Sequence, residues 1–311
     1  MKKKRENSIY EYHPEYSFTV EEWISDIPID ERDIYSLQTL KKKISNGTYS
    51  NIEILILKIL YKYQYLNEYN IRRELHIRLP KKLHKPKFDR NLKDMCKDGT
   101  LIRYTLKKDE KNNQIIYTLS KSAHTYVKKI YKTEIQRYST PKDYSDIDTS
   151  SILEKLSLNQ WHISVREMIG KNIKEEVYYQ KKKISNREVP LISMFRIKPQ
   201  NKNKKNVCVL AIPIYKTEES YNNFIKRLIN INYLKNESRH KYSGIITVVP
   251  CESTIKMQEA YKRINKIKQL RNTNIVFTLD KTTTQNDCFE WLFMCEIESG
   301  TIKYTNCSLN I

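Results

Sequence analysis

Glycine is scarce in this sequence. Its 311 residues include five glycines, Gly47, Gly99, Gly170, Gly244 and Gly300, which lie too far apart to form either glycine-rich loop that cradles nucleotide phosphates. This spacing excludes a P-loop and a dinucleotide-binding fingerprint. The sequence therefore argues against ATP hydrolysis and against a dinucleotide cofactor, and we expect no cofactor.

Long apolar runs are missing as well. No stretch approaches the roughly 18 consecutive apolar residues that a membrane span needs. The first seven residues continue into polar and acidic residues rather than into the apolar core of a signal peptide. We therefore expect a soluble, cytoplasmic protein with no membrane partner.

Metal-binding spacings are also absent. The six cysteines contain no C-x-x-C pair, and several lie in apolar runs, as Cys208 does in residues 206–212. The six histidines show no spacing that suits a metal ion. We expect reduced thiols packed in a core, no metal site, and Trp161-His162 as a packed pair on a strand.

Positive charge and core-forming residues are abundant. Lys and Arg number 57 against 36 Asp and Glu, a formal net charge of +21, and 39% of the residues are hydrophobic. This composition excludes wholesale disorder, and the length suits two domains better than one. Positive charge identifies a nucleic-acid-binding protein only if it is concentrated on a suitable element.

Residues 11–35 are acidic, with eight acids and one base. They are either a solvated lead-in or a segment that lies against a basic surface of the same chain or of a partner. Residues 11–33 are thus one predicted contact for a protein partner. Residues 36–45 place three apolar side chains at helical spacing and end at Asn46-Gly47, which predicts a short helix.

Three further helices are predicted next. Apolar residues over 51–63 repeat at helical spacing. A second, short helix is expected over 68–75, and a third begins near Pro86 and ends at Asp98-Gly99.

Two β-rich runs follow the third helix. Residues 101–106 and 114–119 flank a charged loop and predict a hairpin, after which Ser120 caps a last helix. The order helix, helix, helix, hairpin, helix over residues 51–131 resembles the winged-helix family of DNA-binding domains. The resemblance implies that the third helix enters the major groove and that the hairpin, the wing, touches the DNA backbone.

The charge distribution agrees with this resemblance, because residues 76–97 carry eight bases against two acids. Arg90 and Asn91 are the predicted base-reading side chains, since Arg pairs with guanine and Asn with adenine. The predicted contacts of the third helix and its approach are Lys81, Lys82, Lys85, Lys87, Arg90, Asn91, Lys93 and Lys97. On the wing, Lys107, Lys108 and Lys111 are predicted to contact phosphates or the minor groove.

The predicted domain organisation has four segments. Residues 1–50 form a basic start, an acidic lead-in and a short helix, and residues 51–131 form the winged helix. Residues 132–150 lose the apolar periodicity and gain Pro, Ser, Thr and Asp, which predicts a linker between semi-independent domains. Residues 151–311 form the second domain.

The second domain alternates apolar strands and helices, which predicts an α/β domain with a mixed or parallel sheet flanked by helices. Residues 207–214 and 244–250 are apolar enough for central strands. The succession of residues 158–169, 189–198, 207–234 and 242–250 resembles the restriction-endonuclease-like PD-(D/E)XK domain. With the winged helix before it, the chain resembles the replication-relaxation family of Gram-positive mobile elements, and its fold class is expected to be α+β.

The acids that such nucleases need for a divalent metal are missing. The first position falls in residues 189–191, which hold no acid, and the second falls at Pro213 and Tyr215, with Lys216 remaining. We therefore expect no catalytic residues. A metal-dependent nuclease with acids that have migrated to Glu218 and Glu219, or to Glu175 and Glu176, is an alternative, and so is a winged helix that binds protein.

Two basic runs in the second domain would extend the DNA track if they share a face; otherwise they are solvated. They are Lys181, Lys182 and Lys183, and Lys202, Lys204 and Lys205. The overall expectation is a non-catalytic, sequence-specific double-stranded DNA-binding protein associated with a nucleoid or plasmid. Its second domain is expected to serve for dimerisation, further DNA contact or recruitment of a protein partner, and the resemblance implies control of plasmid or mobile-element replication or transcription.

Overall fold

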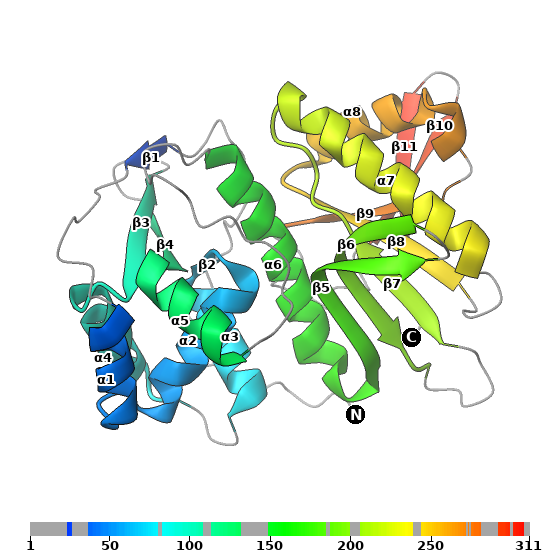
Figure 1. The fold of residues 1–311 in the computed structure, drawn as a ribbon. Coiled ribbons are helices and arrows are strands. Elements are labelled where there is room, and N and C mark those ends of the chain that lie inside the picture. The colour runs from blue at the N-terminus through cyan, green and yellow to red at the C-terminus, as the bar shows by residue number, and fades with distance from the viewer. Residues whose placement is uncertain are drawn as a thin grey trace, which may run out of the picture.

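The computed structural model describes residues 24–26, 37–79, 83–107, 113–131, 149–184, 187–199, 206–238, 244–271, 273, 275–280, 292–298 and 301–307. The chain has an α+β fold in two parts, here called the N-terminal part (residues 24–131) and the C-terminal part (residues 149–307) (Figure 1). Within the described ranges, no helix combines the length and the apolar character that crossing a membrane requires.

The N-terminal part combines helices with a small antiparallel sheet. Its helices are α1 (Leu37–Ser45), α2 (Asn51–Tyr63), α3 (Glu68–Arg78), α4 (Lys85–Lys97) and α5 (Lys121–Tyr131). Its strands, in the order β1-β3-β4-β2, are β1 (Ile24–Asp26), β2 (Leu66–Asn67), β3 (Leu101–Lys107) and β4 (Asn113–Leu119). The helices predicted from the apolar spacing and the predicted hairpin are all present.

Local signals set the ends of these helices. The Ser50 amide donates to Glu53 Oε2 at 2.7 Å at the start of α2, and Ser120 Oγ accepts from the Ala123 amide at 3.3 Å at the start of α5. After α1 and α4, Gly47 and Gly99 have φ values of 71° and 66°. Glycine adopts this left-handed conformation without steric cost, so both helices end where the sequence predicts.

The hairpin is extended by a strand from the acidic segment. Strands β3 and β4 pair from Leu101 opposite Leu119 to Lys107 opposite Asn113. On the other side of β3, β1 pairs antiparallel to it, with Ile24 opposite Lys107. The acidic segment therefore contacts its own chain at 24–26, while its other residues lie outside the described part.

The C-terminal part is built around one mixed sheet of seven strands, in the order β11-β10-β9-β8-β7-β6-β5. Pairing is parallel between β7, β8 and β9 and antiparallel elsewhere. The elements in chain order are α6 (Thr149–Ile169), η3 (Gly170–Asn172), β5 (Ile173–Ile184), β6 (Arg187–Ile197), β7 (Val207–Ala211), α7 (Glu218–Ser238), β8 (Gly244–Cys251), α8 (Thr254–Asn265), η4 (Lys268–Leu270), β9 (Ile275–Leu279), β10 (Leu292–Glu298) and β11 (Thr301–Cys307).

The central strands are the apolar runs that the sequence indicates. Val209 on β7, Val248 and Val249 on β8 are fully buried, as expected for parallel strands covered on both faces. Helix α7 connects β7 to β8, and α8 connects β8 to β9. Cys208, Cys251 and Cys295 are buried free thiols, which confirms the expectation of reduced core cysteines for these three positions.

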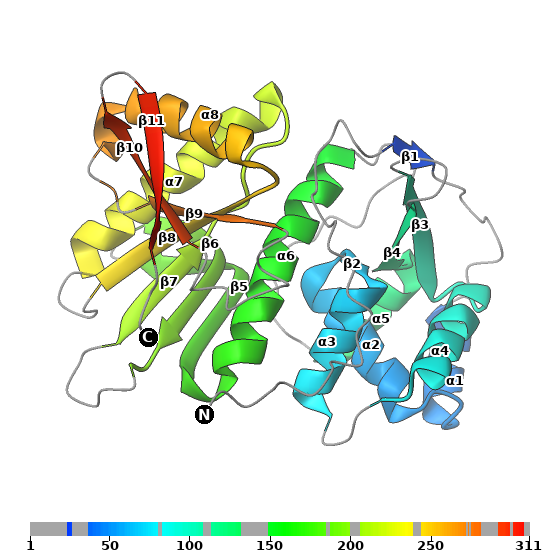
Figure 2. The ribbon, with the colours of Figure 1, turned by 180° about the vertical axis from the view of Figure 1, so that it is seen from behind.

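The expectation that Trp161-His162 lies on a strand is wrong. Both residues lie in α6 and are fully buried. Residues 156–165 are all buried, because α6 lies between the N-terminal part and the sheet of the C-terminal part (Figures 1 and 2). A helix covered on several sides shows no single apolar stripe, and its sequence therefore lacks the usual helical signature.

The expectation of semi-independent domains is also wrong for the described residues. Helix α6 begins at Thr149, within the predicted linker, of which residues 132–148 lie outside the described part. Buried side chains of both parts belong to one continuous core. At their boundary, the rings of Tyr63 on α2 and Tyr178 on β5 meet edge to face at 5.0 Å, so the two parts pack as one body.

Candidate nucleic-acid interface

Helix α4 is anchored by one apolar face. Pro86 lies in its first turn, where a missing amide hydrogen costs no hydrogen bond. Phe88, Leu92 and Met95 are 0–2% exposed, as the sequence predicts. This anchoring fixes which side of α4 faces solvent.

The outward side of α4 is basic. Its exposed cations are Lys85, Lys87, Arg90, Lys93 and Lys97. Asp94 is an exposed acid on this helix, and Asp89 is partly buried. Lys87, Arg90, Lys93 and Lys97 form no ion pair with any residue in the described ranges, whereas Lys43 pairs with Asp98 at 2.6 Å. No acid in the described part of the chain therefore neutralises these four side chains.

Asn91, one of the two predicted base-reading side chains, does not face outward. Asn91 is 8% exposed, because it lies three residues after Phe88 and four before Met95 and so shares their face of the helix. Arg90, by contrast, is exposed. Of the two side chains expected to read bases, Arg90 is thus the one that reaches solvent.

The other predicted contacts of this part are less fully described. Lys81, Lys82, Lys108 and Lys111 lie outside the described residues. Lys107 ends β3 opposite Asn113, and its side chain is likewise outside the described part. Arg103 on β3 is an exposed cation of the hairpin that sequence reasoning missed.

The two basic runs of the C-terminal part are only partly described. Lys181, Lys182 and Lys183 lie on β5 opposite residues 188–190. Lys202, Lys204 and Lys205 fall in the connection from β6 to β7 and lie outside the described residues. That connection begins after Ile197, which pairs with Ile173 at the start of β5. Ile173 and Lys181 are about 26 Å apart along β5, at about 3.3 Å per residue.

A buried carboxylate joins the two parts. Glu74 on α3 is fully buried and accepts from Arg166 Nη1 of α6 at 2.5 Å, from Tyr63 Oη at 2.6 Å and from Arg78 Nε at 3.0 Å. Sequence reasoning missed this cluster, because its charges come from positions about 90 residues apart. The buried pair of Glu74 and Arg166 holds α3 and α6 in one relative geometry.

A second carboxylate lies at the same boundary. Glu176 on β5 pairs with Lys62 of α2, accepts from His162 Nε2 at 2.8 Å and lies 3.2 Å from Arg166 Nε. The other ring nitrogen of His162 is 2.7 Å from Ser193 Oγ. A neutral imidazole protonated on Nε2 satisfies both contacts, since it donates to Glu176 and accepts from Ser193.

Two further contacts align α3 with α6. Arg73 on α3 reaches Glu167 on α6 at 2.6 Å. The Asn159 side-chain amide on α6 donates to the backbone carbonyls of Tyr63 and Tyr65, at 3.0 and 2.7 Å. Arg73 follows Tyr65 along the chain, and its partner Glu167 follows Asn159 along α6 in the same way. Helices α3 and α6 therefore run in the same direction.

Charges at the boundary shift its pKa values. Burial alone would raise the pKa of Glu74, but Arg166, Lys62, Arg78 and the hydrogen bond from Tyr63 outweigh it and lower the pKa to about 2. Burial, aided by the charge of Lys62, lowers the pKa of His162 to about 4. At neutral pH, Glu74 is therefore ionised and His162 is neutral.

The His162 environment predicts a pH dependence of stability. The folded protein resists protonation of this ring until about pH 4, whereas an unfolded chain binds the proton near pH 6.5. Its contribution is complete above about pH 6.5 and is lost as the pH falls toward 4, by up to about 1.4 kcal/mol per pH unit. Urea unfolding between pH 4.5 and 7.5 will show this slope, and His162→Gln will lack that share of it; an unchanged slope in the variant contradicts the assignment.

The positions expected to hold nuclease acids carry other groups. Tyr215 is 1% exposed and donates to Glu259 Oε1 at 3.0 Å. The Lys216 side chain is fully buried and pairs with Glu252 at 2.6 Å. Among the described residues, no group of three or more His, Cys, Asp or Glu side chains is placed to hold a metal ion.

Three of the four acids considered as migrated ligands, Glu175, Glu176 and Glu218, have basic partners. Glu175 pairs with Arg196 at 3.4 Å, and Glu176 belongs to the boundary cluster. Glu218 and Glu219 lie in the first turn of α7, where the helix dipole favours negative charge. Glu218 also accepts from Arg263 Nη1 at 2.7 Å.

Comparison with known proteins finds no match: no family model, no curated protein sequence and no solved structure matches this chain. The candidate interface therefore rests on the charge, burial and geometry of its own residues.

Proposed function

We propose that the protein binds double-stranded DNA in a sequence-specific manner, with α4 in the major groove and the β3–β4 hairpin against the backbone, as in a winged helix. One observation carries the proposal. The helix that this arrangement would present to DNA exposes four cations, Lys87, Arg90, Lys93 and Lys97, that pair with no described residue. Phosphates are the partners that such cations suit.

We further propose that the protein is not an enzyme and regulates replication or transcription of a plasmid or other mobile element, in the cytoplasm. The resemblance to the replication-relaxation family supports this role. The C-terminal part would then be a nuclease-like scaffold without catalytic acids. Its order supports that resemblance: a helix, three antiparallel strands, a helix and a strand parallel to the third.

The salt dependence of binding tests the DNA-binding proposal. Each phosphate contact contributes about −0.9 to the slope of log affinity against log salt, so the four cations of α4 alone predict a slope at least as steep as about −3.6 and a loss of at least about 100-fold between 50 and 200 mM salt. The measurement is fluorescence anisotropy of a labelled duplex of mixed sequence, about 30 bp long so that several phosphate contacts can form. Absence of binding, or binding indifferent to salt, contradicts the proposal.

A further inference from the structure

Three exposed lysines gather at one end of the C-terminal part. Lys171 lies in η3, Lys174 at the start of β5 and Lys198 just after β6. The strand ends are paired there, with Ile173 opposite Ile197, and the Lys198 amide donates to the Asn172 carbonyl at 2.9 Å. All three side chains are exposed, and none pairs with an acid in the described ranges. We name Lys171, Lys174 and Lys198 the lysine cluster.

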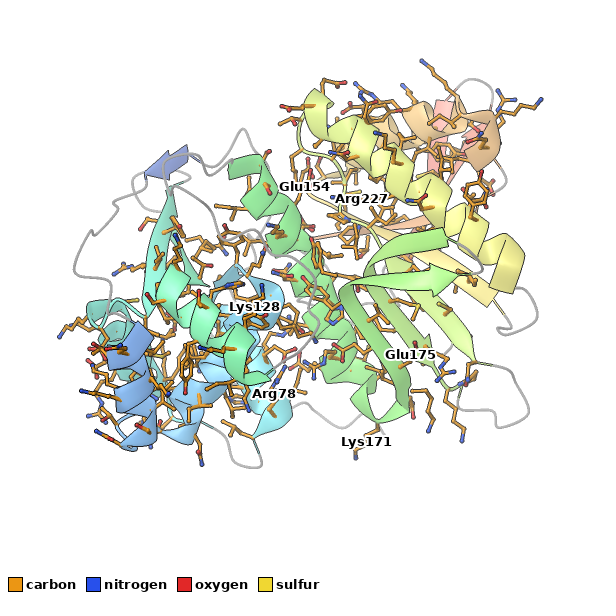
Figure 3. All side chains as sticks on the ribbon, in the orientation of Figure 1. Arg78, Lys128, Glu154, Lys171, Glu175 and Arg227 are labelled. Carbon is orange, nitrogen blue, oxygen red and sulfur yellow. The ribbon has the colours of Figure 1, made fainter. Side chains whose placement is uncertain are left out.

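The lysine cluster lies at the same end of the molecule as Arg78, the last residue of α3. Helices α3 and α6 run in the same direction, so Arg78 at the end of α3 and Lys171 after α6 both lie at the lower end of the view in Figure 3. Helix α4 begins seven residues after Arg78, a distance of at most about 25 Å along an extended chain. The amino end of α4 therefore lies within about 25 Å of Arg78, which shares the lower end of Figure 3 with Lys171.

The boundary contacts hold this relation fixed. Glu74 with Arg166, Glu176 with Lys62, and Arg73 with Glu167 all join the two parts. Glu74 is fully buried, so its pair with Arg166 is costly to break, and the lysine cluster is held in place relative to the N-terminal part, which includes α4. A rigid ligand that contacts both surfaces loses no binding energy to domain motion.

We propose that the DNA bound by α4 continues across the domain boundary, where the lysine cluster contacts phosphates that flank the recognised site. This inference rests on the proposed DNA binding by α4 and extends its footprint. Lysine is a compact, flexible point charge that suits the phosphate backbone rather than base edges. The cluster therefore adds affinity without sequence preference, and it makes the C-terminal part a second DNA-contacting surface.

The test removes the three positive charges of the lysine cluster without changing the fold. The variant carries Lys171→Gln, Lys174→Gln and Lys198→Gln, and the matched control carries Lys262→Gln, Lys266→Gln and Lys268→Gln. The control lysines are equally exposed, on and after α8, which lies at the upper end of Figure 1. Both variants have the same net charge, so any difference between them reports the position of the charges. Urea unfolding of both confirms that the fold is retained.

The readout is the salt slope of binding to the mixed-sequence duplex. Loss of three phosphate contacts predicts a slope smaller by about 2.7 and an affinity at least about 10-fold lower at 150 mM salt, with the control near the wild type. Equal behaviour of the two variants, whether unchanged or equally weakened, overturns the inference. If it is overturned while the wild-type protein binds with a steep salt slope, DNA binding by α4 still stands; if the wild-type protein does not bind, both proposals fail.

Discussion

Replacing Lys87 and Arg90 together by glutamate is expected to weaken binding of duplex DNA by at least about 100-fold at 150 mM salt and to lower the salt slope by about 2. Both side chains are exposed on the outward face of α4 and pair with no described residue. The substitutions remove two phosphate contacts and place two negative charges against the DNA. Because the sites are exposed, the free energy of unfolding should change by less than about 0.5 kcal/mol each.

The control for this double variant is Lys128→Glu with Lys129→Glu on α5. These lysines are also exposed, and the change in net charge is the same. Helix α5 lies in front in the view of Figure 1, where Figure 3 labels Lys128, whereas α4 lies in front in the opposite view of Figure 2. We expect the control to bind DNA within about 3-fold of the wild type, because α5 and α4 face opposite sides in the two views and salt screens charges that lie away from the DNA. Equal losses in both variants would mean that bulk charge, not α4, drives binding.

Replacement of Glu74 by glutamine is expected to lower the free energy of unfolding by about 3–5 kcal/mol at pH 7. Glu74 is fully buried and carries the negative charge that Arg166 and Arg78 face. The amide keeps the size of the side chain but leaves these guanidinium groups without their carboxylate. The measurement is urea unfolding followed by circular dichroism, with DNA affinity measured on the folded variant.

Glu218→Gln provides the matched control for Glu74→Gln. Glu218 also accepts two hydrogen bonds from one guanidinium, that of Arg263, at 2.7 and 2.5 Å. Its side chain is 73% exposed, and exposed pairs contribute at most about 1 kcal/mol. If the two variants lost the same stability, the Glu74 cluster would not be what locks the two parts together.

Local signals explain why the N-terminal part was predictable. Ser120 caps α5 through its own hydroxyl, and Gly99 takes the left-handed conformation that ends α4. Phe88, Leu92 and Met95 are spaced by four and three residues, which fixes their common face without any tertiary information. The same spacing rule, applied to Asn91, would have placed it on the buried face.

The domain boundary was not predictable, for a different physical reason. Its ion pairs join residues such as Glu74 and Arg166, and nothing in the sequence near either residue indicates the other. Helix α6 is buried along residues 156–165, so the polarity pattern that usually reveals a surface helix is absent. Charged residues that would normally face solvent thus became the contacts that fix the second part against the first.

Sequence-specific DNA binding is tested most directly by selection of bound fragments from sheared genomic and plasmid DNA of the host, with competitor DNA at physiological salt. The wild-type protein and the Lys87→Glu, Arg90→Glu variant are compared in parallel. Sequence-specific binding through α4 predicts recovery of one or a few sites by the wild type, at an origin or a promoter, and their loss in the variant. Uniform recovery of all fragments, or recovery of none, would contradict sequence-specific DNA binding through α4.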